Sequence, residues 1–502
     1  MAALAFYWLL LTPTTWAVNN GLARTPPMGW NNWNSLGCDV SQSLLLDTAT
    51  NLVELGLRDV GYEYVVLDDC WSDGRDQQGK LKVDLHRFPA GMNFVSDSVH
   101  KHGLKFGMYS SAGHLTCARY EGSLDHEIDD AQSFAGWGVD YFKYDNCYSL
   151  GRIGAEPSFK RYNDMAMALN ATGRPIVYSL CNWGEDFVSS WGASIANSWR
   201  VSGDIYDSFS RPDDLCSCTN QDPSAPFCVA PGSQCSVLTI LNRVAPYADR
   251  GQFGAWQDLD MLEVGNGGMT VQEQFAHQAM WAALKSPLLI GADIRDLDAE
   301  ALSILNNPAI IALSQDPLGR PVRRVIHNPN HAKDKWGVGE THVWSGPLYG
   351  GDQVVIALNA VPDDLRFNLQ LEDIFVHDGP GGKAPGCKQV WDVYDLWEAR
   401  MPVATARRIV NAAKDPKKGT GETAETIEKI YQEIDWFNST ETSYREALDR
   451  EDTRLFGKKV DSWRQGKPLI LSVPKHSARV LRLRNLDRTA VLKKYGTQKD
   501  EL

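Results

Sequence analysis

The chain has 502 residues, of which 43% are hydrophobic and 23% are charged, a composition that allows roughly two or three globular domains. Its 63 acidic residues outnumber its 50 basic residues, and the resulting net charge of −13 opposes binding to nucleic acid or to an anionic membrane surface. We therefore expect neither as a partner.

The first 17 residues form an apolar segment of the length of a signal peptide, with the small residues Thr15 and Ala17 before a cleavage point. The alternative, a buried N-terminal helix, is disfavoured by Pro13 and by the polar residues that follow. No other apolar run approaches the ~20 residues of a membrane span. We predict entry into the secretory pathway and secretion, with no membrane anchor.

Residues 18–321 alternate short apolar runs with longer segments of helical periodicity. Eight such units predict an α/β fold, a (β/α)8 TIM barrel, rather than an open sheet. The runs are MGWNNW, YEYVVLDDCW, LKFGMYSS, DYFKYDNC, PIVYSLCNW, SWRVSGDI, GAWQDLDML and PLLIGADI. Most of them end in polar residues, which a barrel brings together around one pocket.

The run YFKYDNC places Lys143 and Asp145 two residues apart, so they point to the same face of the predicted strand. Such a pair is either a structural ion pair or part of an active site. Hydrolysis of a glycosidic bond needs two carboxyl groups, and we choose Asp145 and Asp204, at the ends of the fourth and sixth strands. Lys143 is expected to favour the ionised form of Asp145, and Arg200 to orient a sugar hydroxyl.

The doublet Asp68 and Asp69 either binds a divalent ion or accepts hydrogen bonds from neighbouring sugar hydroxyls. Few histidines stand at the strand ends, so we favour the hydroxyl clamp and expect no metal and no cofactor. Trp33 and Trp183 are candidates to pack on the apolar face of a sugar ring. Two other functions are possible for such a barrel. One is carbohydrate binding without catalysis, and the other is a metal-dependent hydrolase or isomerase in which the doublet and Asp260 are the metal ligands.

Residues 322–486 change to alternating runs without intervening helices, which predicts an antiparallel sheet domain. A charge-rich segment at about 404–463 has apolar residues at helical spacing, and we interpret it as a mostly exposed helical insertion and a candidate homo-oligomer contact. The tail, residues 487–502, ends in KDEL, the signal for retention in the endoplasmic reticulum.

The ten cysteines favour an oxidising compartment. Cys216, Cys218, Cys228 and Cys235 lie in a loop rich in proline and serine, which we expect to hold disulfides rather than zinc, because the spacing is C-x-C and no histidine is near. The sequons at Asn170 and Asn438 predict glycosylation.

Seven motifs occur in order from about residue 21 to 325: GLARTPPMGWNNWNSLGC, LDDCW, FGMYSSAG, YFKYDNC, YSLCNWG, NSWRVSGDI and WQDLDMLEVGNGGMT. Together they resemble the α-galactosidases (melibiases) of glycoside hydrolase family 27, nearest to the fungal members. The segments VYDLWEAR and VPKHSARVLRLR continue the resemblance through a C-terminal β-sandwich.

The resemblance implies a retaining exo-α-galactosidase in which Asp145 is the nucleophile and Asp204 the acid/base. It implies that the Asp68–Asp69 doublet binds the 4- and 6-hydroxyls of galactose. Trp183 would crowd an N-acetyl group at C2, which favours α-galactosidase over α-N-acetylgalactosaminidase. The expected substrate is a small-molecule galactoside, an oligosaccharide or galactomannan. Further sugar-binding positions implied by the resemblance are Trp33, Tyr109, Cys117, Lys143, Cys181, Arg200 and Asp260.

The family pattern also implies a disulfide scheme. Its pairs are Cys38 with Cys70, Cys117 with Cys147, Cys216 with Cys235, and Cys218 with Cys228, which leaves Cys181 and Cys387 free.

Overall fold

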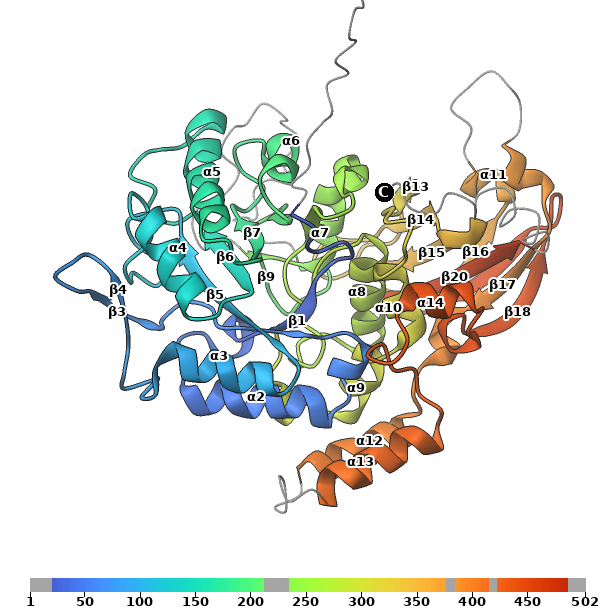
Figure 1. Ribbon diagram of the computed structural model, residues 1–502. Helices are drawn as coiled ribbons and strands as arrows, with labels where there is room; N and C mark the ends of the chain where they lie inside the picture. The colour runs from blue at the N-terminus through green and yellow to red at the C-terminus, as the bar shows by residue number, and fades with distance from the viewer. Residues whose placement is uncertain (1–19, 212–233, 376–383, 415–421, 486–502) are drawn as a thin grey trace, which may run out of the picture.

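The computed structural model describes residues 20–211, 234–375, 384–414 and 422–485 (Figure 1). The predicted signal peptide, the tail with its KDEL sequence, and Cys216, Cys218 and Cys228 lie outside these ranges. Within the described ranges, no helix is long and apolar enough to cross a membrane.

Eight parallel strands form a barrel, as predicted. Their order is β11-β8-β7-β6-β5-β2-β1-β12, and a bridge between Leu262 and Ile290 connects the chain after β11 to β12 and closes the ring. The strands are β1 (Met28–Asn31), β2 (Tyr64–Val66), β5 (Lys105–Ser111), β6 (Tyr141–Asp145), β7 (Val177–Cys181), β8 (Ser198–Arg200), β11 (Trp256–Asp258) and β12 (Leu288–Ile290). Two short pairs lie outside the barrel: β3 (Ser72–Arg75) with β4 (Leu81–Val83), and β9 (Asp204–Ile205) with β10 (Gln234–Cys235).

Helices surround the barrel because each buries one apolar stripe against the strands. In α2, Ser41 caps the first turn by accepting a hydrogen bond from the Leu44 N–H (3.2 Å), and Leu45, Ala49 and Leu52 are buried at three- and four-residue spacing. The helices of this domain are α1 (Trp33–Leu36), α2 (Gln42–Glu54), α3 (Gly91–Lys101), α4 (Glu127–Gly136), α5 (Ala155–Ala171), α6 (Val188–Trp191), α7 (Val237–Val244), α8 (Val271–Ala283), α9 (Ala299–Leu305) and α10 (Pro308–Ser314).

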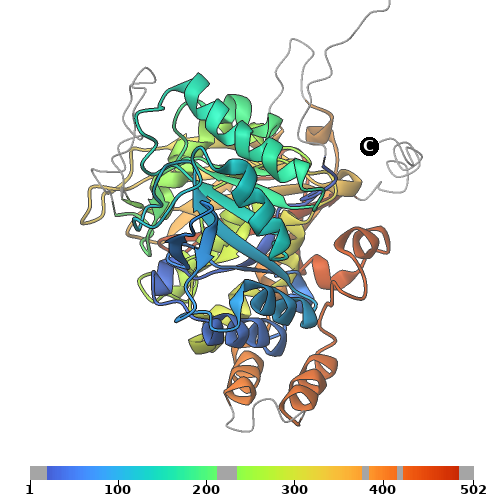
Figure 2. The ribbon, with the colours of Figure 1, turned by 60° about the vertical axis from the view of Figure 1, so that its left-hand side comes forward.

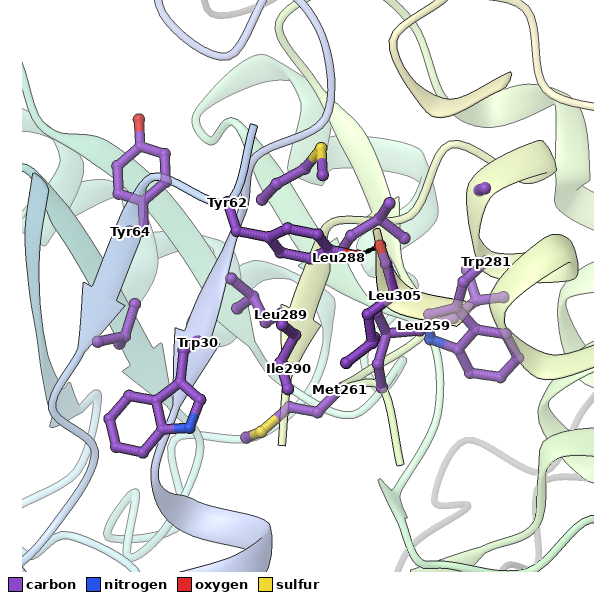
Figure 3. Packing of buried hydrophobic residues seen from close by; sticks show 14 of the residues in the cluster. Trp30, Tyr62, Tyr64, Leu259, Met261, Trp281, Leu288, Leu289, Ile290 and Leu305 are labelled. Atoms are coloured by element: carbon purple, nitrogen blue, oxygen red, sulfur yellow. Dashed lines mark hydrogen bonds between the residues drawn. The ribbon is translucent and has the colours of Figure 1, made fainter. Parts of the chain in front are cut away.

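The barrel strands are buried on both faces, as parallel strands covered by helices are. Figure 3 shows part of this core near β1 and β12, with Trp30, Leu289 and Met261 among the packed side chains. Tyr62 is also buried there, and its hydroxyl donates a hydrogen bond to the Leu305 carbonyl (2.9 Å). This packing makes the barrel a rigid base for side chains at the ends of its strands.

The C-terminal domain is an antiparallel β-sandwich, as predicted. Val355 of the larger sheet and Leu471 of the smaller sheet belong to one apolar core shared by both sheets. In sheet order, the larger sheet contains β13 (Arg323–Asn328), β14 (Thr341–Pro347), β15 (Gln353–Asn359), β20 (Ser477–Asn485), β17 (Trp391–Asp395) and β18 (Lys458–Trp463). The smaller sheet pairs β16 (Leu365–Leu369) with β19 (Leu469–Val473), and α11 (Leu371–Ile374) follows β16.

The charge-rich segment at 404–463 is less exposed than the sequence suggested. Ile427 is buried, and the hydroxyls of Tyr431 and Tyr444 donate hydrogen bonds to the carbonyls of Leu55 (2.6 Å) and Val60 (3.0 Å). These carbonyls precede β2, so the segment packs where the strands begin, at the end of the barrel opposite the predicted site (Figure 2). The segment contains α12 (Val403–Ala413), α13 (Glu422–Glu433) and α14 (Tyr444–Asp449), and its last part is strand β18.

The two sequons differ in exposure. Asn170 is exposed near the end of α5, whereas Asn438 is half-buried in the loop after α13. Glycosylation at both stays a prediction.

Candidate active site

The predicted site residues lie together where the parallel strands end. In the register of the sheet, Asp145 of β6 is beside Cys181 of β7, and Lys143 is beside Tyr109 of β5. Arg200 is the last residue of β8. A cavity at this end of the barrel is lined by Asn31, Tyr141, Lys143, Ser179, Cys181, Arg200, Asp258, Asp260, Met261 and Leu289.

The carboxylate of Asp145 is buried and fixed by two hydrogen-bond donors. The Tyr109 hydroxyl donates to Oδ2 (2.8 Å), and the Asn146 backbone N–H donates to Oδ1 (2.9 Å). Burial raises the pKa of Asp145 to about 6 despite the lowering effects of the Lys143 charge and of these hydrogen bonds, and the charge of Asp204 adds to the increase. Lys143 thus favours the ionised form of Asp145, as predicted, but desolvation has the larger effect on the pKa.

The direct partner of Lys143 is Asp68 rather than Asp145. The Lys143 ammonium lies 2.7 Å from Asp68 Oδ2, and Asn31 Nδ2 donates to the same oxygen (2.8 Å). Burial alone would lower the pKa of Lys143, but the charge of Asp68 raises it well above its usual value. The lysine therefore stays protonated and orients the first carboxylate of the doublet.

Asp69, the second carboxylate of the doublet, is held by the backbone. The N–H groups of Cys70 (2.7 Å) and Ala118 (2.9 Å) donate to its two oxygens, and burial raises its pKa. An ionised carboxylate has about four acceptor positions, so each member of the doublet can still accept hydrogen bonds from a ligand. The arrangement suits a clamp for hydroxyl groups.

Arg200 connects Asp204 and Asp260. Its Nη2 lies 2.9 Å from Asp204 Oδ1 and 2.8 Å from Asp260 Oδ2, and the Ile205 N–H also donates to Asp260 Oδ2 (2.7 Å). Arg200 and Asp260 are buried, whereas the side chain of Asp204 is 37% exposed. Burial raises the pKa of Asp260 to about 6 even though Arg200 lowers it. Asp204 is thus the carboxylate of this group that solvent can reach.

The two predicted tryptophans occupy different positions. Trp33 is half-buried, and its backbone N–H donates to Asn31 Oδ1 (2.8 Å). Trp183 is buried against Cys147 and Cys181 in the left-handed backbone region, with φ of 58°. The next residue, Gly184, also has a positive φ, and a Cβ there would lie 2.3 Å from the Val201 carbonyl oxygen, so only glycine fits.

The cysteines follow the implied scheme within the described ranges. Cys38 is bonded to Cys70 and Cys117 to Cys147, while Cys181 and Cys387 are buried and take part in no disulfide among the described residues. Cys235 is disulfide-bonded as well. Cys117 Sγ lies 3.2 Å from Asp145 Oδ2, and Cys181 Sγ lies 3.4 Å from Arg200 Nη1, so both sulfurs contact the site directly.

Two asparagines that orient the carboxylates were not predicted from the sequence. Asn31 donates to Asp68, and Asn146 supports Asp145 through its backbone. The side-chain amide of Asn146 is itself fixed, because it donates to Glu185 Oε2 (2.9 Å) and accepts from Arg161 (2.9 Å). Asn31 ends β1 and Asn146 directly follows β6, and these positions at the ends of barrel strands could have identified both as site residues.

Buried carboxylates gathered at the C-terminal end of a (β/α)8 barrel are typical of a glycoside hydrolase, and this is the class of the protein. The family model described as alpha galactosidase A matches residues 25–316, and the model of the alpha galactosidase C-terminal beta sandwich domain matches residues 338–420. The chain belongs to the alpha galactosidase (melibiase) family, glycoside hydrolase family 27.

Similar proteins come from yeasts, as the sequence resemblance implied. An alpha-galactosidase of Lachancea cidri is 47% identical over 466 residues, which cover 93% of this chain and 95% of the relative. The solved structure of an alpha-galactosidase from Saccharomyces cerevisiae is 46% identical, with a TM-score of 0.85, and the match covers 93% of this chain and 99% of that one. A structure of alpha-galactosidase from the same yeast with raffinose matches with the same values.

Proposed function

We propose that this protein is a retaining exo-α-galactosidase that removes terminal, non-reducing α-D-galactosyl residues from oligosaccharides or galactomannan. In the first step Asp204 donates a proton to the leaving oxygen, while Asp145 attacks the anomeric carbon and forms a galactosyl ester. In the second step Asp204 accepts a proton from the attacking water. This releases galactose with its configuration retained and restores both carboxyl groups.

The observation that carries the proposal is the difference between the surroundings of the two carboxylates. Asp145 is buried and held by two donors, Tyr109 and Asn146, which suits a nucleophile that must attack one carbon atom. Asp204 is partly exposed beside Arg200, which suits a group that exchanges protons with a leaving group and with water. Two carboxyl groups in unlike environments are the usual basis for separate nucleophile and acid/base roles.

In this proposal the sugar bound by the remaining side chains is galactose. The Asp68–Asp69 doublet accepts hydrogen bonds from the 4- and 6-hydroxyls, with Lys143 fixing the first carboxylate. The other sugar contacts in this proposal come from Trp33, Tyr109, Cys117, Cys181, Arg200 and Asp260. The names of the relatives and the raffinose complex of the yeast protein support this assignment.

Trp183 provides the selectivity against a substituent at C2. Its ring is buried against Cys181, at the end of β7, and in this proposal it occupies the space that an N-acetyl group at C2 would need. We therefore favour α-galactosidase activity over α-N-acetylgalactosaminidase activity.

The proposal is tested with p-nitrophenyl α-galactoside, using wild type, Asp145→Asn and Asp204→Asn, and proton NMR of the first sugar released. We expect α-galactose from wild type and no turnover by Asp145→Asn, with an unchanged melting temperature as the check on folding. Release of β-galactose would refute the retaining mechanism, and an active Asp145→Asn variant would refute the nucleophile. Galactose binding without hydrolysis by wild type would favour the silent carbohydrate-binding barrel.

A further inference from the structure

Two histidines and a glutamate converge at the start of the C-terminal domain. His327 of β13 and His342 of β14 are directly opposite each other in the antiparallel register, so their side chains point to the same face of the sheet. Glu340 lies two residues before His342, and its side chain therefore projects to that face as well. None of the three lines the active-site cavity.

The three side chains bring potential metal ligands together. Glu340 Oε2 lies 2.7 Å from His327 Nε2 and 3.5 Å from His342 Nε2, and all three atoms lie within 4.8 Å of one another. Zinc lies about 2.0–2.1 Å from such ligands, so the ligand atoms of a tetrahedral site are about 3.3 Å apart. Small side-chain movements therefore suffice to give the distances of a zinc site.

The carboxylate of Glu340 is oriented by the barrel. Asn242 of α7 donates a hydrogen bond from Nδ2 to Oε1 (2.6 Å), which leaves Oε2 directed at the two imidazoles. Contacts of this kind, from residues that are not ligands themselves, fix the orientation of metal ligands. The group thus lies at the junction of the two domains, where β13 and β14 form the side of the sandwich nearest the barrel (Figure 1).

Arg324 is a cation beside the group, and it has partners of its own. Its Nη1 donates to Asn242 Oδ1, and its guanidinium carbon lies 5.6 Å from the centroid of the Trp344 ring. The same Nη1 lies 3.4 Å from His342 Nε2. Because arginine can only donate, this contact suits the tautomer of His342 that presents a lone pair to the group. A metal ion at the group accepts that lone pair in place of Arg324.

The group is closed on one side and open on the other. The side chain of His342 is fully buried and that of Glu340 is 11% exposed, whereas that of His327 is 35% exposed. An ion can therefore enter past His327, and a water molecule can complete its coordination there. Three protein ligands and one water are a common arrangement for zinc.

We propose that His327, Glu340 and His342 form a binding site for a divalent transition-metal ion such as Zn²⁺. Imidazole ligands suit zinc, copper or nickel, whereas Mg²⁺ and Ca²⁺ take oxygen ligands. The ion joins β13 to β14 beside their contact with α7, so its role is to stabilise the junction of the two domains. The inference is independent of the proposed function, because none of the proposed catalytic or sugar-binding residues takes part.

The experiment is a calorimetric titration of the full-length, tag-free protein with ZnCl₂ after dialysis against EDTA. We expect one equivalent of Zn²⁺ to bind to wild type, and the affinity to fall at least about tenfold in His327→Ala and in Glu340→Gln. His100→Ala is the matched control, because His100 Nε2 also lies 2.7 Å from a carboxylate oxygen, that of Asp140, and its side chain is 34% exposed. This pair belongs to no group of three potential ligands among the described residues, so the control should bind zinc as wild type does.

The melting temperature provides a second measurement. A ligand that binds only the folded state stabilises it, so excess Zn²⁺ should raise the melting temperature of wild type and of His100→Ala more than that of His327→Ala. His327 is partly exposed, so its replacement is compatible with folding, and the melting temperature in EDTA checks this.

Two results would overturn the inference. If wild type binds no zinc, the three side chains form only a hydrogen-bonded group. If wild type, His327→Ala and Glu340→Gln bind zinc equally well, the ion binds elsewhere. His327→Ala should hydrolyse p-nitrophenyl α-galactoside as fast as wild type does, so this test and that of the proposed function fail separately.

Discussion

The hydroxyl of Tyr109 is expected to set the pH at which Asp145 becomes active. It donates to Asp145 Oδ2 at 2.8 Å, a bond that stabilises the ionised carboxylate more than the protonated one. Tyr109→Phe removes the donor and keeps the buried ring. Because the ionised form then loses a stabilising contact, the pKa of Asp145 rises above its value of about 6.

The size of the shift follows from the energy of the bond. A hydrogen bond to a charged group contributes about 1.5–3 kcal/mol, and one pKa unit corresponds to about 1.4 kcal/mol. The pKa of Asp145 should therefore rise by about one to two units in Tyr109→Phe. The proposed role of Asp145 as nucleophile requires its ionised form, so kcat/KM should fall about 10- to 100-fold on the acid side of the profile and much less above about pH 8.

The assay is kcat/KM for p-nitrophenyl α-galactoside from pH 4 to pH 9. Tyr178→Phe is the matched control, because Tyr178 is a buried tyrosine of strand β7, which pairs with the strand β6 that carries Asp145, and its hydroxyl donates to the Tyr162 carbonyl (2.9 Å). Its acid limb should coincide with that of wild type. If Tyr109→Phe loses the same factor at every pH, the hydroxyl does not act through ionisation of Asp145 and the reasoning is wrong.

Four further predictions concern the ion pair, the sugar pocket, the C-terminal helices and metals. Lys143→Met leaves Asp68 without its buried partner, so the free energy of unfolding in urea should fall by about 3–5 kcal/mol, and adding Asp68→Asn should restore part of it; additive losses would contradict the pairing. Trp183→Ala should permit measurable hydrolysis of p-nitrophenyl α-N-acetylgalactosaminide, and its continued rejection would show that another group excludes the substituent. Tyr431→Phe removes a hydrogen bond to the Leu55 carbonyl and should cost about 1 kcal/mol of stability with kcat/KM unchanged, whereas a change in kcat/KM would connect the helices to the site. Dialysis against EDTA should leave activity intact, because Lys143 already pairs with Asp68, and Arg200 with Asp204 and Asp260; a loss restored by Mg²⁺ or Zn²⁺ would favour a metal-dependent hydrolase.

The barrel could be predicted because each strand is a short apolar run and most of the runs end in polar residues. A run such as YFKYDNC also fixes which side chains share a face, since side chains alternate along a strand. It does not fix their partners. Lys143 and Asp145 do share a face, but Lys143 contacts Asp68, a residue 75 positions earlier in the chain. That contact depends on the tilt and closure of the barrel, which no local pattern encodes.

The burial of the charge-rich segment was underestimated for a related reason. Its charged side chains do lie at the surface, but a helix needs only one apolar stripe to pack against another part of the protein. In α13, Ile427, Ile430 and Tyr431 have the three- and four-residue spacing of such a stripe, and both isoleucines are buried. The spacing was visible in the sequence, whereas the barrel surface that receives it was not.

The charges at the rim suit the transition state of glycoside hydrolysis. Positive charge develops there at the anomeric carbon and the ring oxygen, and fixed negative groups stabilise it without rearrangement. The rim carboxylates outnumber the rim cations. The cations are Lys143 and Arg200, and the carboxylates are those of Asp68, Asp69, Asp145, Asp204, Asp258 and Asp260. Burial raises the pKa of Asp145 and Asp260 to about 6, so without the two cations fewer carboxylates would be ionised.

The placement of Lys143 then has a physical reason. If its ammonium were hydrogen-bonded directly to Asp145, the attacking carboxylate would have to break an ion pair before it could reach the anomeric carbon. Paired with Asp68 instead, Lys143 still lowers the pKa of Asp145 through its charge, while the oxygens of Asp145 are held only by a neutral hydroxyl from Tyr109 and a backbone N–H. The lysine thus supports ionisation of the proposed nucleophile without blocking its attack.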